Sequence, residues 1–511
     1  MSFFDTAAAK TQTPAAGPAA ASNAIYLGKG DAPQQLLLKY ANRHGLIAGA
    51  TGTGKTLTLQ GLAEGFSQAA VPVFIADVKG DLSGISQPGT PKDPLVKRAN
   101  DIGYSYNYFA CPAVFWDVFG KNGHPVRTTI SEMGPMLLSR LLELNDTQEG
   151  VLNIVFAVAD AQGMLLLDLD DLRAMLTHVS ENAPQYSTQY GNVAPASVAA
   201  IQRGLLTLEQ QGAKQLFGEP ALDIADFMQV APNGMGAVNI FSAEALMQSP
   251  KMYAMFMLWL MAELFEDLPE VGDLDKPKLV FFFDEAHLLF GDAPKALVEK
   301  IEQLVRLIRS KGVGVYFITQ NPADIPESVL GQLSNRVQHA LRAFTPADQK
   351  GVRAAAATFR ANPTFKTEEA ITILGVGEAL VSTLDDKGTP TIVERTLIKP
   401  PSSLVGPCTP AQRAQTMSQS PVAGKYDQAI NRESAHEMLN KRAQQGSGLW
   451  GSVAGSVGMG GGNAAAARPA PRGRQPEGLA TVVVKSVVRA AGSQLGRQIA
   501  RGILSSMLKG R

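Results

Sequence analysis

One glycine-rich loop constrains this chain more than any other part of its sequence. The loop reads Gly49-Ala50-Thr51-Gly52-Thr53-Gly54-Lys55-Thr56 and fits the pattern G-x-x-x-x-G-K-[ST]. An apolar run before it, Leu46–Ala48, predicts a strand, and Lys55–Ala69 after it predicts a helix. Backbone N–H groups of such a loop hold phosphates, helped by the helix N-terminus, with the lysine on the β- and γ-phosphates and the Thr56 hydroxyl on Mg²⁺. A chance glycine-rich turn is the alternative, and the flanking strand and helix make it the weaker one.

A second motif places two acids directly after an apolar run. Leu279–Phe283 predicts a buried strand that delivers Asp284 and Glu285 at its C-terminal end, where α/β sheets bind ligands. Asp284 is expected to hold the Mg²⁺ shell through water. Glu285 is placed to polarise the water that attacks the γ-phosphate, which favours an ATP hydrolase over a GTPase switch, in which Gln positions the water. Read alone, the acidic pair would be assigned to a solvated loop.

Strand-like runs alternate with helical patterns along most of the chain. Helices are expected over Ala243–Phe265 and over Pro294–Arg309, whose apolar residues share one face. The alternation predicts an α/β fold with a mainly parallel sheet. Further strands are expected at Val71–Ala76, Gly236–Phe241, Lys278–Phe283, Gly314–Thr319 and Arg336–Leu341, with a hairpin of Ala379–Thr383 and Thr391–Leu397.

The domain organisation follows from shifts in composition. An Ala/Thr/Pro-rich start suggests a disordered leader, and a Gly/Ala/Pro-rich stretch near the end suggests a flexible linker. The expected units are residues 1–22 as the leader, 23–400 as the nucleotide-binding body with a helical insertion at about 128–228, 401–443 as a helical extension, 444–476 as the linker and 477–511 as a basic amphipathic helix.

Charge is divided unevenly although the total is zero. From Gly446 to Arg511 there are nine Lys/Arg and one acid, a net +8, which leaves −8 for the rest of the chain. Such a tail suits docking on the acidic body or on a neighbouring subunit, contact with an anionic membrane surface, or nucleic acid. The two cysteines lack metal spacing, and no secretory signal or membrane-length apolar run is present, so a cytoplasmic location is expected.

Two further segments make the chain resemble one superfamily of P-loop ATPases. Residues 306–322, RLIRSKGVGVYFITQNP, resemble the Arg-Lys-Gly-type element of the HerA/FtsK superfamily and its strand that ends in Gln. Residues 77–81, DVKGD, resemble that superfamily's Asp-Pro-Lys-Gly element. Over roughly residues 24–400 the chain is similar to bacterial HerA-like (YjgR-type) ATPases. The resemblance implies a RecA-like core of the additional-strand type.

The resemblance also implies roles for individual residues. Gln320 matches the sensor that contacts the γ-phosphate or the attacking water, and a strand-end hydrogen bond is the alternative. Arg309 matches the arginine finger that reaches a neighbouring subunit's nucleotide, with Arg306 as the reserve candidate and a helix-capping cation as the alternative. Asp77 is expected either to join the metal shell or shape the loop around the site, or, as an equal alternative, to belong to a plain strand-end turn. His287 is expected to link Glu285 to its surroundings rather than act as a base.

The expected function is Mg²⁺-dependent ATP hydrolysis by a homo-oligomer, which the resemblance implies is a hexameric ring. Such a ring is expected to move double-stranded DNA, as a helicase or translocase. The alternatives are an ATP-driven factor that remodels proteins without translocation and an ATP-bound switch with slow turnover. The segment Asn23–Ala48 is too short for the β-barrel that HerA proper carries before its motor domain. That difference and the acidic body keep the alternatives open.

Overall fold

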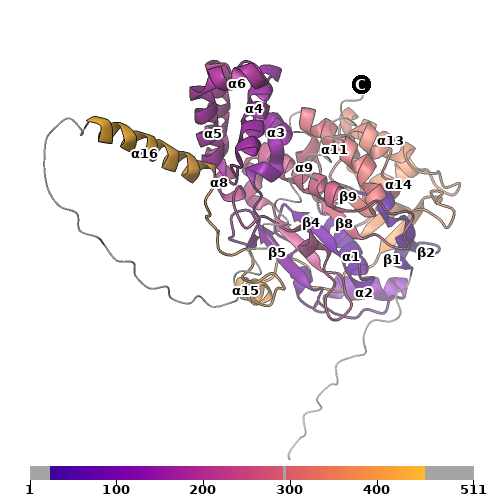
Figure 1. The fold of residues 1–511 in the computed structure, drawn as a ribbon. Helices are drawn as coiled ribbons and strands as arrows, with labels where there is room; N and C mark the ends of the chain where they lie inside the picture. The colour runs from indigo at the N-terminus through magenta and orange to yellow at the C-terminus, as the bar shows by residue number, and fades with distance from the viewer. Residues whose placement is uncertain (1–22, 292–294, 455–511) are drawn as a thin grey trace, which may run out of the picture.

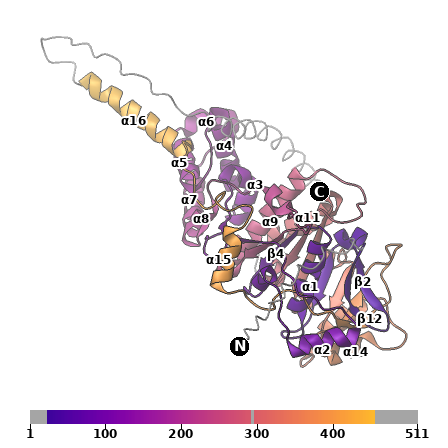
Figure 2. The ribbon, with the colours of Figure 1, turned by 90° about the horizontal axis from the view of Figure 1, so that it is seen from below.

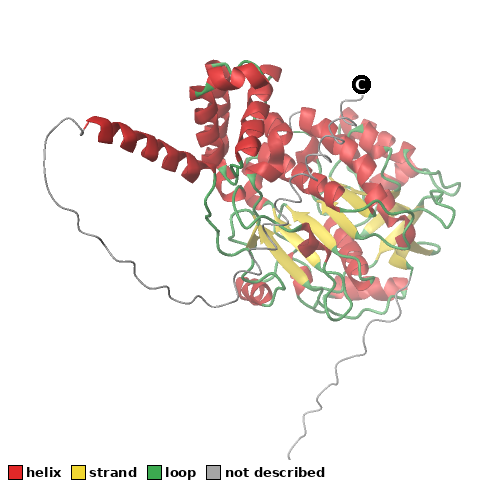
Figure 3. Ribbon diagram, viewed as in Figure 1, coloured by secondary structure: helices red, strands yellow, loops and turns green. Residues whose placement is uncertain are grey.

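The computed structural model describes residues 23–291 and 295–454, and its centre is one large sheet (Figure 1). Within these residues the sheet has twelve strands in the order β2-β1-β12-β11-β10-β3-β9-β8-β4-β7-β5-β6. Helices cover both faces of the sheet (Figure 3). The predicted α/β class is confirmed.

The part of the sheet from β10 to β6 is parallel throughout. The strand β9 lies between β3, which leads into the glycine-rich loop, and β8, which leads into the acidic pair. This insertion is the additional-strand arrangement that the resemblance implied. The parallel strands are β3 (Gly45–Ala48), β4 (Val73–Asp77), β5 (Ala113–Asp117), β6 (His124–Pro125), β7 (Val238–Ser242), β8 (Leu279–Phe283), β9 (Val313–Thr319) and β10 (Asn335–Gln338).

The other end of the sheet is antiparallel. The predicted hairpin is confirmed as β11 and β12, and β11 also pairs with β10. The first two strands of the chain close this edge: β1 pairs with β12 and β2 pairs with β1, and the sequence patterns did not predict either strand. These strands are β1 (Ala24–Lys29), β2 (Pro33–Leu37), β11 (Glu378–Ser382) and β12 (Glu394–Ile398).

Alternating side chains of the central strands supply two separate cores. Phe281 and Phe283 of β8 pack in the larger cluster with α9 and α11, whereas Val280 and Phe282 pack with α1 on the opposite face. Apolar residues on both faces make each central strand a continuous hydrophobic run. The covering helices are α1 (Lys55–Gln68), α2 (Asp93–Ile102) and α15 (Pro410–Ser418) on one side, and α9 (Pro250–Asp267), α11 (Lys295–Leu307), α13 (Pro346–Ala357) and α14 (Thr367–Ile373) on the other (Figure 1).

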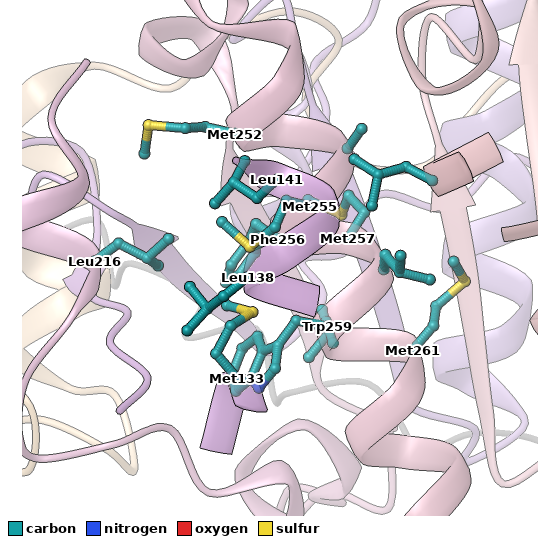
Figure 4. Close-up of a cluster of buried hydrophobic side chains, with 14 of the residues drawn as sticks. Met133, Leu138, Leu141, Leu216, Met252, Met255, Phe256, Met257, Trp259 and Met261 are labelled. Atoms are coloured by element: carbon teal, nitrogen blue, oxygen red, sulfur yellow. The ribbon is translucent and has the colours of Figure 1, made fainter. Parts of the chain in front are cut away.

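Helix α9 is buried on all sides, and Figure 4 shows its methionines and Trp259 packed against α3. The expected single helix over Ala243–Phe265 is wrong at its start. Residues Glu244–Gln248 form a 3-10 turn, and a new helix begins at Pro250, because proline suits the first turn of a helix but not its interior. None of the helices that the structure describes is long and apolar enough to cross a membrane.

Between β6 and β7 the chain forms a helical unit that rises from the sheet (Figure 1). Each of α3, α4 and α5 begins with a capping box. In it the side chain of the N-cap residue accepts a backbone N–H three residues later, and the side chain of that later residue accepts the N–H of the N-cap residue. The predicted helical insertion at about 128–228 corresponds to this unit. Its helices are α3 (Ile130–Leu141), α4 (Asp146–Gln162), α5 (Leu169–Glu181), α6 (Ala183–Tyr190), α7 (Pro195–Gln210) and α8 (Ala213–Leu216).

Helix α16 (Ala435–Ala454) packs its first turns on α5 and then projects from the body (Figure 2). The predicted boundary at residue 444 between extension and linker is therefore wrong, because the helix continues to Ala454. Its start is fixed by Asp171, whose carboxylate accepts the N–H of His436, and by Glu437, which accepts the N–H of Ser434. The leader 1–22, the rest of the expected linker and the expected basic helix 477–511 lie outside the described residues.

Helix α11 ends before the predicted Arg309. It stops at Leu307, and Ile308–Lys311 continue as a 3-10 turn that Gly312 closes with a φ of 77°. A glycine in the left-handed conformation after the last turn is a common way to end a helix. The pattern of apolar residues alone does not predict such an end. The predicted apolar face is confirmed, since all of its members are buried: Leu297, Ile301, Leu304, Val305 and Ile308.

The helix that follows the glycine-rich loop is tied to the chain after β12 by one buried carboxylate. Glu64 in α1 accepts hydrogen bonds from Ser402 N at 2.9 Å, Ser403 N at 2.7 Å and Ser403 Oγ at 2.5 Å. Burial raises the pKa of Glu64, and the nearby Lys399 opposes that rise.

We expect Glu64→Gln to destabilise the fold by about 2–4 kcal/mol, because the amide NH₂ would face donors and leave them buried without an acceptor. The midpoint of urea unfolding, followed by circular dichroism, measures this loss. Glu369→Gln, in an exposed ion pair with Lys366, is the matched control and should not shift the midpoint. An unshifted midpoint for Glu64→Gln would contradict the assignment.

Candidate functional site

The glycine-rich loop leaves β3 at the carboxyl edge of the sheet and is anchored to the neighbouring strand ends. Gly49 N donates to Thr319 O at 3.2 Å, and Ala50 N donates to Ala340 O at 2.7 Å. From the hairpin side, Gly377 N donates to Thr53 O at 2.9 Å. The loop is thus held by the segments that end β9 and follow β10, and by the turn before β11.

Two glycines of the loop have no substitute. A Cβ on Gly49, whose φ is 153°, would lie 2.5 Å from His339 Cβ, and Gly54 has a φ of 113°. Gly54 is also the N-cap of α1, so its left-handed backbone turns the loop directly into the helix. These positions need glycine for conformation and for space.

His339 supports the loop from below, a role that the sequence analysis missed. Its ring is fully buried, Thr58 Oγ1 lies 2.8 Å from Nε2, and Glu378 O lies 2.9 Å from Nδ1. Burial lowers the pKa of His339 to about 4, so the ring is neutral under the loop. The predicted strand Arg336–Leu341 contained His339, whereas β10 ends at Gln338 and leaves His339 just past the strand, at the ligand-binding edge of the sheet.

The open side of the loop presents donors without acceptors. Within the described residues no acceptor lies on the backbone N–H groups of Gly52, Gly54, Lys55 or Thr56. Lys55 is 7% exposed, and its Nζ donates to Gly49 O at 2.6 Å and to Ala50 O at 3.1 Å. Unpaired N–H groups at a helix N-terminus, beside a lysine bound only to carbonyls, form a site for an anion.

The two acids after β8 differ in their partners although both are buried. Burial raises the pKa of Asp284 to about 7, and Lys79 opposes the rise. Burial also acts to raise the pKa of Glu285, but Lys79, Gln320 and the nearby His287 together outweigh burial, so the pKa of Glu285 is lowered. Glu285 also has a φ of 50°, unusual for a residue with a side chain, and such strain gathers at functional sites.

The turn after β4 brings Lys79 to Glu285. Asp77 accepts the N–H of Gly80 at 2.8 Å and of Leu82 at 3.2 Å, and burial raises its pKa to about 6. Its carboxylate therefore shapes this turn beside the acidic pair. Lys79 Nζ then lies 2.5 Å from Glu285 Oε1. The sequence analysis assigned this lysine no role.

Gln320 connects the acidic pair to the glycine-rich loop. Its Nε2 donates to Glu285 Oε1 at 3.2 Å and Oε2 at 3.3 Å, and its Oε1 accepts from Thr51 Oγ1 at 3.1 Å. His287 Nδ1 lies 3.3 Å from Glu285 Oε2, which fits the predicted linking position. The structure thus brings together Lys55, Thr56, Asp284, Glu285 and Gln320 at one edge.

Arg309 does not join this group. It precedes β9, whereas Gln320 follows β9, so the seven-residue strand separates them by roughly 20 Å. Burial and then the neighbouring Arg43 lower the pKa of Arg309. Arg306 lies exposed in the last turn of α11, on the same side of the sheet as Arg309. Arg309 therefore lies too far from Gln320 and from the glycine-rich loop of this chain to contact them.

His44 has a structural role away from the glycine-rich loop. Its Nδ1 accepts the N–H of Val315 at 3.0 Å, so its Nε2–H donates to Val305 O at 2.8 Å. The ring joins the end of α11 to β9, and burial lowers its pKa to about 4.

The sheet order and the loop define the class of this protein: a P-loop fold of the RecA-like, additional-strand type. The family model described as "Helicase HerA-like C-terminal" matches residues 23–511, and the chain belongs to that family. No curated protein sequence matches it significantly.

Solved structures similar to this chain have low sequence identity to it. The coupling protein TrwBdeltaN70 is 14% identical, with 75% of this chain and 92% of that chain covered and a TM-score of 0.48. VirB4 of Thermoanaerobacter pseudethanolicus is 15% identical, with 78% and 100% covered and a TM-score of 0.45. TrwB in complex with ADP and Mg²⁺ is 14% identical, with 81% and 92% covered and a TM-score of 0.46.

Proposed function

We propose that the protein is a Mg²⁺-dependent ATP hydrolase. The observation that carries the proposal is the buried, anionic Glu285, held by Gln320 beside a loop in which the N–H groups of Gly52, Gly54, Lys55 and Thr56 meet no acceptor among the described residues. Membership of the HerA-like family and the TrwB complex with ADP and Mg²⁺ agree with this choice of ligand.

The residues present fit a nucleotide and its cation. The N–H groups of the loop and the ammonium of Lys55 are available for the β- and γ-phosphates. Thr56, in the first turn of α1, and Asp284, at the end of β8, would hold Mg²⁺, which supplies charge neutralisation across those phosphates. Glu285 then orients and deprotonates the attacking water. Gln320 would contact the γ-phosphate and couple that contact to Glu285 through the hydrogen bond between the two side chains.

The active unit we propose is a homo-oligomer, by family resemblance a hexameric ring. Arg309 lies at the amino edge of the sheet, far from the loop at the carboxyl edge. A head-to-tail ring brings the amino edge of one subunit to the carboxyl edge of the next. Arg309 would then stabilise charge on the neighbour's γ-phosphate, with Arg306 as the reserve.

The work done by hydrolysis is proposed to be movement along double-stranded DNA, in the cytoplasm. The family description, helicase HerA-like, is the observation that favours this substrate. The basic segment after residue 446 would contact a neighbouring subunit or a membrane surface. Protein remodelling without translocation is the competing function.

We expect linear duplex DNA to raise the steady-state ATPase rate severalfold at low salt, and the increase to vanish as salt rises, because phosphate contacts release counterions. Phosphate release measured with and without DNA over a salt series tests this, with Glu285→Gln as the control for contaminating activity. A rate that is indifferent to DNA at every salt concentration would favour protein remodelling instead.

A further inference from the structure

Two lysines approach the site from different elements of the fold. Lys55 begins α1, and Lys79 lies in the turn after β4. They are close enough that Lys79 adds to burial in lowering the pKa of Lys55. Lys79 keeps 41% of its side chain exposed while its ammonium pairs with Glu285, whose side chain is 5% exposed. A second cation therefore lies beside the anion site described above.

Each lysine now binds a protein oxygen that a triphosphate would outcompete. Lys55 holds the carbonyls of Gly49 and Ala50, and Lys79 holds the carboxylate of Glu285. The backbone under Lys79 is fixed by Asp77, but its four-carbon side chain is flexible and half-exposed. The ammonium is thus free to change partners without any change in the turn.

We propose that Lys79 is a second cationic ligand of the terminal phosphate, and that it exchanges Glu285 for that phosphate when ATP binds. The exchange leaves the Glu285 carboxylate free for the attacking water only when a γ-phosphate is present. With ADP, Lys79 stays on Glu285. This inference rests on the ATP hydrolysis proposed above and adds the contact by which the site distinguishes triphosphate from diphosphate.

Binding of a non-hydrolysable ATP analogue and of ADP, each with Mg²⁺, tests the contact by calorimetry. We expect Lys79→Gln to weaken the analogue about tenfold, the loss of one charge-assisted hydrogen bond, and to leave ADP unchanged. Lys79→Arg should restore much of the difference. Lys97→Gln, in an exposed ion pair with Asp101, is the matched control. Equal effects on both nucleotides, or no effect, would overturn the contact.

A double-mutant cycle separates partner exchange from a fixed ion pair. If Lys79 must leave Glu285 to reach the phosphate, Glu285→Gln tightens the analogue, and that gain shrinks in the Lys79→Gln background. If Lys79 merely neutralises Glu285, Glu285→Gln tightens the analogue more in the Lys79→Gln background than in the wild type. The reason is that, without Lys79, the Glu285 carboxylate repels the phosphates unopposed. This result would refute the exchange.

The two proposals fail differently in these experiments. Wild-type protein that neither binds nor hydrolyses ATP refutes the proposed function. Wild-type protein that hydrolyses ATP, with a Lys79→Gln variant that keeps the wild-type ratio of analogue to ADP affinity, refutes only the role of Lys79.

Discussion

Glu285→Gln should lower the ATPase kcat by about 10²–10⁴-fold, the usual contribution of a positioned general base. Gln keeps the size of the side chain and can still accept a hydrogen bond from Gln320, but it cannot take a proton from water. The ion pair with Lys79 helps to lower the pKa of Glu285, so the wild-type carboxylate is deprotonated at neutral pH.

Steady-state phosphate release measures the loss, and calorimetry with a non-hydrolysable ATP analogue shows whether binding survives. We expect binding to be retained, because the loop and Lys55 hold the phosphates independently of Glu285. Glu369→Gln, an exposed change remote from the loop, should keep full activity. Full turnover by Glu285→Gln would remove Glu285 from the mechanism and leave the acidic pair without a catalytic member.

The parts of this site that the sequence predicted are those carried by short local patterns. The glycine spacing next to Lys55 identifies the loop, and the apolar run of β8 identifies the acidic pair Asp284-Glu285 that follows it. Each pattern combines residue identity with strand or helix context, so no long-range information is needed. The same kind of pattern predicted β3, β4, β7, β8, β9 and β10, since runs buried on both faces are apolar throughout, but it did not predict β5 or β6.

The parts that the sequence did not predict depend on which strands become neighbours. Lys79 reaches Glu285 because β4 pairs with β8, although their sequences are some 200 residues apart. His339 reaches the loop because β10 pairs with β3. No local sequence pattern shows which strands pair. The resemblance therefore matched residues 77–81 to a family element but did not predict that Lys79 contacts Glu285.

Helix ends were missed for a different reason. Apolar periodicity located the buried faces of α9 and α11, but Pro250 and Gly312 set where those helices begin and end. Periodicity describes the middle of a helix, whereas its limits depend on single residues with special backbone preferences. The error matters at α11, because the 3-10 turn after it determines where Arg309 is presented.

Arg309→Ala should lose ATPase activity nearly as fully as Glu285→Gln when each variant is tested alone. An arginine finger contributes about 10³–10⁵-fold in related phosphoryl transfer. Arg309 lies across the length of β9 from its own Gln320, so any catalytic effect must be exerted on another subunit. The same geometry predicts that the two inactive variants will complement each other.

Mixed oligomers make that prediction quantitative. When the two variants are coexpressed with different tags and assemble at random, a working site needs an Arg309→Ala subunit beside a Glu285→Gln subunit that donates its finger. In a head-to-tail ring this occurs at about a quarter of the sites, so about a quarter of the wild-type rate should return. Arg306→Ala, treated in the same way, shows which arginine is the finger. Mixed assemblies that recover nothing would show that Arg309 acts within its own subunit, on folding rather than on the neighbour's phosphate.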